Sequence, residues 1–179
     1  LVTRSKDNID PVVGARVASF ASHDFFAQGA FSYLDANFQW SFDYSASNDD
    51  NNRIIKSDLQ TTFDSIFGTS ASLAPGPYDE HHKVFTGLVK WQQQNFSLDI
   101  MTWRNFDYGL GAGIAQALDS RGKGSYHFNH YKAQYDMSEW VTGTFIGTLS
   151  YKQQKSDNFL YIFPAGTVLP IGADGNINF

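Results

Sequence analysis

The chain has 179 residues, a formal net charge of -5, no cysteine and 16% aromatic residues. Its length allows one domain of ordinary size. An acidic balance without a basic cluster argues against nucleic acid as a partner, and the absence of cysteine excludes disulfides and thiolate metal sites. The sequence contains no window of about 18 apolar residues, so we expect no transmembrane helix.

Alternation of apolar and polar residues with a period of two recurs along the chain, and this is the period of a β-strand. The clearest case is the segment 36–46, in which Phe38, Trp40, Phe42 and Tyr44 alternate with polar residues. Runs of 9–13 residues have the length that a tilted strand needs to cross a bilayer. The predicted strands are, in chain order, 12–20, 25–34, 36–46, 82–92, 95–104, 125–137 and 140–151.

The predicted connections between these strands are of two kinds. Tight turns are expected at 34–35, 93–95 and 138–139, and long polar loops at 47–80, 105–124 and 152–179. Short turns that alternate with long loops are typical of outer-membrane barrels, in which the short turns are periplasmic and the long loops extracellular. We therefore predict an all-β fold, a transmembrane antiparallel β-barrel, with 7–179 forming part of the barrel.

Alternation also predicts which face each residue occupies. The residues expected to face lipid are Phe38, Trp40, Phe42 and Tyr44. The residues expected to face the lumen are Arg16, Gln39, Asp43, Asp99 and Lys132. The alternative is a soluble β-sandwich, whose strands also alternate but average about 5–6 residues.

Two short motifs resemble the TonB-dependent receptors of bacterial outer membranes. Leu1-Val2-Thr3-Arg4-Ser5 resembles the end of the plug domain of that family, and Asn95-Phe96-Ser97-Leu98 resembles a step between two of its early strands. The resemblance implies that 1–6 is the end of the plug or the linker to the barrel. It also implies that the remainder is about seven strands of a barrel of the 22-stranded type.

The resemblance further implies uptake, energised by TonB, of a scarce nutrient such as a ferric siderophore or haem. The partners would be lipid and lipopolysaccharide, the plug and remaining strands, TonB, and a small-molecule ligand, possibly a metal chelate. An odd number of strands also suggests a larger barrel, because single-chain bacterial barrels have an even number. The alternation of 171–179 leaves open a closing strand, and hence a small closed barrel with a structural or adhesive role.

The sequence contains no recognisable catalytic arrangement, so we expect neither an enzyme nor a cofactor, and no metal site. Ligand capture is instead expected where the predicted strands meet the extracellular loops, because aromatic and arginine side chains are common anchors in binding sites. The candidate ligand-binding residues are Trp103, Arg104, Phe106, Tyr108, Tyr78, His81 and His82.

Overall fold

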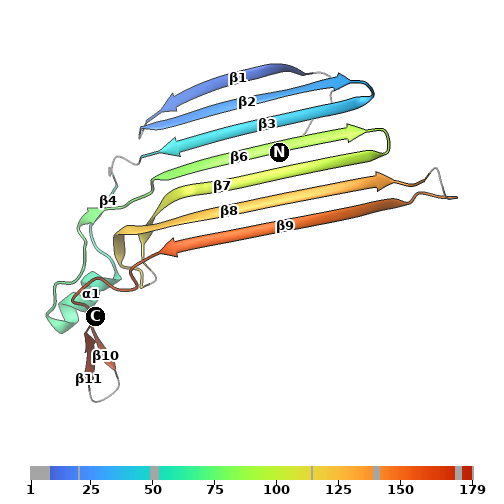
Figure 1. The fold of residues 1–179 in the computed structure, drawn as a ribbon. Coiled ribbons are helices and arrows are strands. Elements are labelled where there is room, and N and C mark those ends of the chain that lie inside the picture. The colour runs from blue at the N-terminus through green and yellow to red at the C-terminus, as the bar shows by residue number, and fades with distance from the viewer. Residues whose placement is uncertain are drawn as a thin grey trace.

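A computed structural model describes residues 9–19, 21–48, 53–113, 115–138, 142–171 and 175–178. Its main feature is one antiparallel sheet of seven strands in the order β1-β2-β3-β6-β7-β8-β9, which follows the order of the chain (Figure 1). The sheet is open, with β1 and β9 at its edges. The fold is therefore all-β, as predicted, whereas the segment 1–6 lies outside the described residues. The strands are β1 Ile9–Ala18, β2 Ser22–Tyr33, β3 Ala36–Ser47, β6 His82–Gln93, β7 Phe96–Ala112, β8 Leu118–Asp136 and β9 Ile146–Phe159.

Two tight turns lie where the sequence predicts them. Leu34 and Asp35 join β2 to β3 with φ values of 46° and 61°, which is the positive pair that a two-residue type I′ turn requires. Gln93 is the register partner of Phe96, so β6 and β7 are joined by a two-residue turn that starts at Gln94.

The third turn differs from the prediction. A strand was expected over 140–151, but β9 begins at Ile146. The intervening chain is held by Ser138, whose backbone N–H donates to Asp136 (2.9 Å) and whose hydroxyl accepts from the backbone N–H of Phe145 (3.0 Å). Residues 139–141 lie outside the described residues. The phase of the predicted alternation is retained, because Leu149 and Tyr151 still share one face.

Strands β7, β8 and β9 extend well beyond their predicted ends on the loop side, so strand replaces much of two expected loops. β7 continues to Ala112 and β8 begins at Leu118, so most of 105–124 is strand. β9 runs to Phe159, so 152–159 is strand as well. Beyond it, β10 (Val168–Ile171) pairs with β11 (Gly175–Asn178), so the described residues Ile171 and Gly175–Asn178 do not belong to a single closing strand.

The segment 47–80, which the sequence predicts to be a long loop, contains regular secondary structure. Strands β4 (Ile54–Ile55) and β5 (Gly76–Pro77) pair with each other, and helix α1 (Leu59–Phe67) lies between them. Asp58 caps the helix by accepting a hydrogen bond from the backbone N–H of Thr61 (2.8 Å), whose hydroxyl accepts from the N–H of Asp58 (3.2 Å). This is a capping box, and it fixes where the helix begins.

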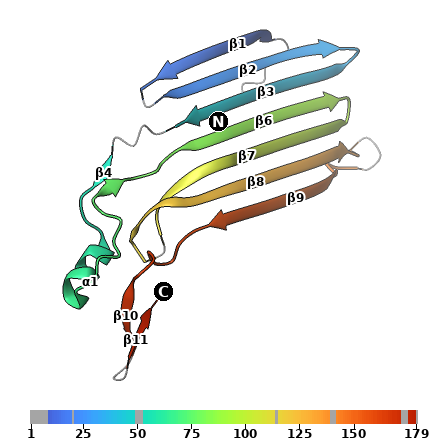
Figure 2. The ribbon, with the colours of Figure 1, turned by 60° about the vertical axis from the view of Figure 1, so that its left-hand side comes forward.

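Two carboxylates, Asp58 and Asp119, join loop segments at the far end of the β7–β8 hairpin. The second oxygen of Asp58 accepts from the backbone N–H of Leu118 (2.7 Å). Asp119, which is 2% exposed, accepts from the N–H groups of Gly122 (2.8 Å) and Tyr161 (3.0 Å). These bonds tie three loop segments into a folded layer at the end of the sheet opposite the tight turns (Figures 1 and 2).

The two faces of the sheet differ sharply in chemistry. One, which we name the apolar face, carries Phe38, Trp40, Phe42 and Tyr44. The alternation predicts that these four residues share a face. The other, the polar face, carries residues such as Gln39 and its register partner Lys90. Paired residues project to the same side, so the register extends both assignments across the sheet.

The large apolar side chains do not form a buried core. Among the described residues, the buried hydrophobic ones are Ala30, Ala46, Ala71, Ala117 and Leu118. On the apolar face, Phe25, Phe31, Leu149 and Tyr151 are each more than half exposed. In the described part of the chain, no helix is both long and apolar enough to span a membrane.

The apolar side chains form a belt that crosses the strands obliquely. On β3 the belt extends to Tyr44, whereas on β9 it ends at Tyr151, which lies in the row of Trp40, four residues nearer the tight turns. Four residues correspond to ~13 Å along a strand, and the four strand spacings from β3 to β9 correspond to ~19 Å. For the belt to lie in one plane perpendicular to an axis, the strands must be tilted from that axis by ~35°. Membrane barrels have strands tilted by about 35–45° from the barrel axis.

Candidate functional site

The predicted ligand-binding residues divide between the two faces at the loop end of the sheet. Trp103 is the register partner of Phe128 and belongs to the polar face, whereas Arg104 pairs with His127 on the apolar face. The ring of Phe106 lies 6.3 Å from that of His127 and so is on the side of Arg104. The structure therefore does not gather this set into one site.

Tyr108 returns to the polar face because β7 contains a bulge between Asn105 and Tyr108. It pairs with His82 on one side and Gly124 on the other, so Tyr108 and His82 are brought together. The Tyr108 side chain extends across Gly124, and its hydroxyl donates to Asn158 on β9 (2.6 Å). A Cβ at position 124 would collide with both side chains, so glycine is required for this bridge.

Tyr78 is part of the folded loop layer. The guanidinium of Arg53 lies 4.9 Å from the centre of its ring, and its backbone N–H donates to the carbonyl of Arg53 (2.9 Å). A Cβ on Gly111 would meet the same ring. Its contacts stabilise the loop against the β7–β8 hairpin, and they do not place it beside Trp103.

His81 forms a charged cluster with residues that sequence reasoning did not connect. Its Nδ1 lies 2.5 Å from Asp79 and its Nε2 lies 3.3 Å from Asp107, while Lys83 lies 3.5 Å from Asp107. Burial acts to lower the pKa of His81, but the hydrogen bonds and charges of the two carboxylates raise it above its usual value. Burial likewise acts to raise the pKa of Asp107, but His81 and Lys83 lower it.

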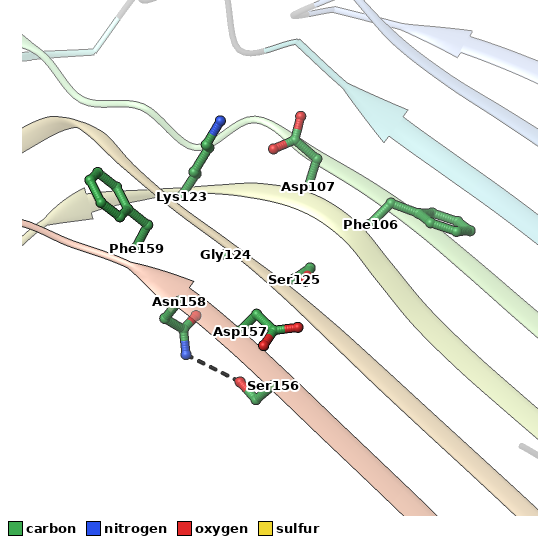
Figure 3. Close-up of a pocket in the computed structure, with 9 residues that line it drawn as sticks. All are labelled: Phe106, Asp107, Lys123, Gly124, Ser125, Ser156, Asp157, Asn158 and Phe159. Carbon is green, nitrogen blue, oxygen red and sulfur yellow. Dashed lines mark hydrogen bonds between the residues drawn. The ribbon is translucent and has the colours of Figure 1, made fainter.

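A hollow of about 590 Å³ lies at the ends of β7, β8 and β9 (Figure 3). Its lining mixes the carboxylates of Asp107 and Asp157 with the Lys123 ammonium and two phenyl rings. Beside it, the side-chain amide of Asn158 donates to the hydroxyl of Ser156 (3.1 Å). Such a lining can hold a polar ligand by hydrogen bonds. The lining residues are Phe106, Asp107, Lys123, Gly124, Ser125, Ser156, Asp157, Asn158 and Phe159.

On the polar face, three aromatic residues of β7 and β8 lie together. The ring of Trp103 lies 5.0 Å from that of Tyr126, at an interplanar angle of 58°, and Phe128 is the register partner of Trp103. Sequence reasoning selected Trp103 but missed Tyr126 and Phe128. The signal was present, because both lie at positions where the alternation of β8 calls for polar residues.

The residues predicted to face a lumen share the polar face. Gln39, Asp99 and Lys132 lie in one row of the register, and Lys132 is 4.0 Å from Asp99. Asp43 lies on the same side of β3. Near the edge, Arg16 lies 3.6 Å from its register partner Asp24. That this face borders a lumen remains a prediction.

In the described residues, no group of three or more histidine, cysteine, aspartate or glutamate side chains could hold a metal ion. In the His81 cluster, each ring nitrogen faces a carboxylate. Comparisons with known protein families, with curated proteins and with solved structures find no match to this chain.

Proposed function

We propose that the sheet is part of the wall of an outer-membrane β-barrel, and that this barrel is a TonB-dependent receptor for a scarce nutrient. The observation that carries the proposal is the apolar belt, whose aromatic side chains are exposed or partly exposed on a face that no described layer covers. Exposing that many large apolar side chains to water is unfavourable, whereas lipid stabilises them.

The shape of the belt supports the same proposal. The belt lies in one plane perpendicular to the barrel axis if the strands are tilted from that axis by ~35°. Closed membrane barrels have strands tilted by roughly 35–45°. The unequal ends of the sheet agree with it, since tight turns lie at one end and folded loops at the other. In a β-sandwich, by contrast, a second sheet would pack on the apolar face at a distance of about 10 Å.

Transport and TonB dependence rest on the resemblance of Leu1–Ser5 and Asn95–Leu98 to TonB-dependent receptors. The proposed partners are the plug and remaining strands of the receptor, TonB, lipopolysaccharide and a small-molecule nutrient, and the proposed location is the bacterial outer membrane. A small closed barrel with a structural or adhesive role is the alternative, and it would not need TonB.

Uptake by the full-length receptor in a Gram-negative host that lacks its own receptors would test the transport function. The probes are radiolabelled ferric hydroxamate, haemin, cobalamin and maltohexaose, each with and without a functional TonB. We expect accumulation of one probe that falls to background when TonB is deleted. Failure to accumulate any probe, or accumulation that is equal without TonB, would contradict the proposal.

A further inference from the structure

The aromatic group on the polar face is the most unexpected feature of the sheet. Trp103, Tyr126 and Phe128 lie on two adjacent strands and are partly exposed. They are on the side opposite the apolar belt, so contact with lipid does not account for them. We propose that they form the platform of a binding site for a neutral oligosaccharide, which would be the nutrient of the transporter proposed above.

The residues beside the platform are hydrogen-bonding groups without charge. Gln154 is the register partner of Phe128, Ser156 that of Tyr126, and Thr86 that of Trp103. A pyranose ring has an apolar C–H face, which packs on an aromatic ring, and a rim of hydroxyls, which need amide and hydroxyl partners. The platform and its neighbours supply both kinds of group.

The charge of the site favours a neutral ligand over a ferric chelate or haem. In the three polar-face rows of Leu88, Thr86 and Val84, strands β3 to β9 carry two permanently charged side chains, Lys152 and Asp43, of opposite sign. Ferric catecholates and the propionates of haem are anionic and are bound by several cations. One lysine does not offset their charge, whereas an oligosaccharide needs no cation.

The position of the platform suits capture of a ligand from the loop side. It lies between the Asp99–Lys132 pair, which is nearer the tight turns, and the Tyr108–Asn158 bridge, which is nearer the loops. Tyr108 and Asn158 continue the same combination of an aromatic ring and an amide toward the loops. A chain of several sugars could therefore contact both groups.

Calorimetric titration of the full receptor in detergent would test this site. The probes are maltohexaose, cellohexaose and chitohexaose, with haemin and a ferric catecholate for comparison. We expect at least one neutral oligosaccharide to bind, with an affinity at least tenfold weaker in Trp103→Ala and partly restored in Trp103→Phe. Phe96→Ala is the matched control, because Phe96 is an aromatic residue of the same strand on the apolar face, and the affinity of this variant should be unchanged.

Absence of binding by all three oligosaccharides would overturn the proposal, as would equal affinities of the Trp103→Ala variant and the unmodified receptor. Heat-modifiable migration of each variant shows whether its barrel has folded. The two proposals can fail separately. TonB-dependent uptake of a ferric chelate that is insensitive to Trp103→Ala would retain the transporter and reject the sugar site. Sugar binding by a protein that is absent from the outer membrane would retain the sugar site and reject the transporter.

Discussion

In the half of the sheet next to the tight turns, side chains alternate between an apolar and a polar face, whereas in the half next to the loops both faces are largely polar. Tyr151 and Lys152 on β9 mark the change, since every residue from there to Asn158 is polar. A period of two arises only where the two faces meet different surroundings. The belt half is therefore specified by its environment, and the loop half by hydrogen bonds between particular residues.

The largest effect should separate the two faces within the belt half. Val89 lies on the apolar face and its neighbour Leu88 on the polar face of the same strand. We expect Val89→Arg to destabilise the folded barrel by about 2–4 kcal/mol, because a charge would enter lipid, and Leu88→Arg to cost less than about 1 kcal/mol. Unfolding by urea in lipid vesicles measures both. An equal loss of folding free energy in the two variants would contradict the proposal that only the apolar face of the sheet contacts lipid.

The same contrast explains what could be predicted from the sequence. The faces of Phe38 and Gln39, and the turn at Leu34 and Asp35, follow from alternation and turn chemistry, and they are read correctly. The extension of β9 to Phe159 was missed because residues 152–158 are polar on both faces and so resemble a loop. Pairing with β8, which no local pattern reveals, makes them a strand.

The structure of the loop half could not be predicted from the sequence for a second reason. Its contacts join segments that are far apart in the chain. Asp58 is a good helix cap on its own, but its bond to the N–H of Leu118 spans 60 positions. The division of Trp103 and Arg104 between faces follows from alternation. The return of Tyr108 to the polar face depends on a bulge that alternation does not predict.

Removal of Asp58 should have the next largest effect, confined to the loop half. Asp58→Ala loses the helix cap, worth about 0.5–2 kcal/mol, and leaves the N–H of Leu118 without its acceptor. We expect faster hydrogen exchange at Leu118 and faster proteolysis within 53–81, with no change in the belt strands. Asp58→Asn keeps an oxygen acceptor for the N–H of Thr61 but sets an amide NH₂ against the N–H of Leu118, so Leu118 should exchange faster while the helix cap is retained. Unchanged exchange at Leu118 in Asp58→Ala would show that the carboxylate does not hold the loop.

The bridge across Gly124 should contribute less. Tyr108→Phe removes the hydrogen bond to Asn158, which is worth about 0.5–1.5 kcal/mol. Gly124→Ala should remove the same bond by displacing both side chains. A double-mutant cycle measured by urea unfolding should therefore give a combined loss well below the sum of the single losses. Additive losses would mean that the glycine serves something other than this bridge.

The smallest effect should be a dependence on pH at the cluster of His81, Asp79, Asp107 and Lys83. The folded-state pKa of His81 is raised, so its contribution is complete below about pH 6.5 and is lost as pH rises through the higher folded value. The pKa of Asp107 is lowered, so its contribution is complete above about pH 3.9 and is lost as pH falls through the lower folded value. The cluster should therefore be most stable between about pH 4 and 6.5.

The amide of Gly109 reports on this cluster, because its N–H donates to the carbonyl of His81 (2.9 Å). Its protection factor, corrected for intrinsic exchange, should fall a few-fold as pH rises through the raised folded pKa of His81, because the ring then loses one of the two N–H protons that face Asp79 and Asp107. His81→Asn should abolish that fall, since asparagine does not titrate. The same fall in the variant would assign the pH dependence to a group outside the cluster, and the loop half would then owe its order at that point to backbone pairing alone.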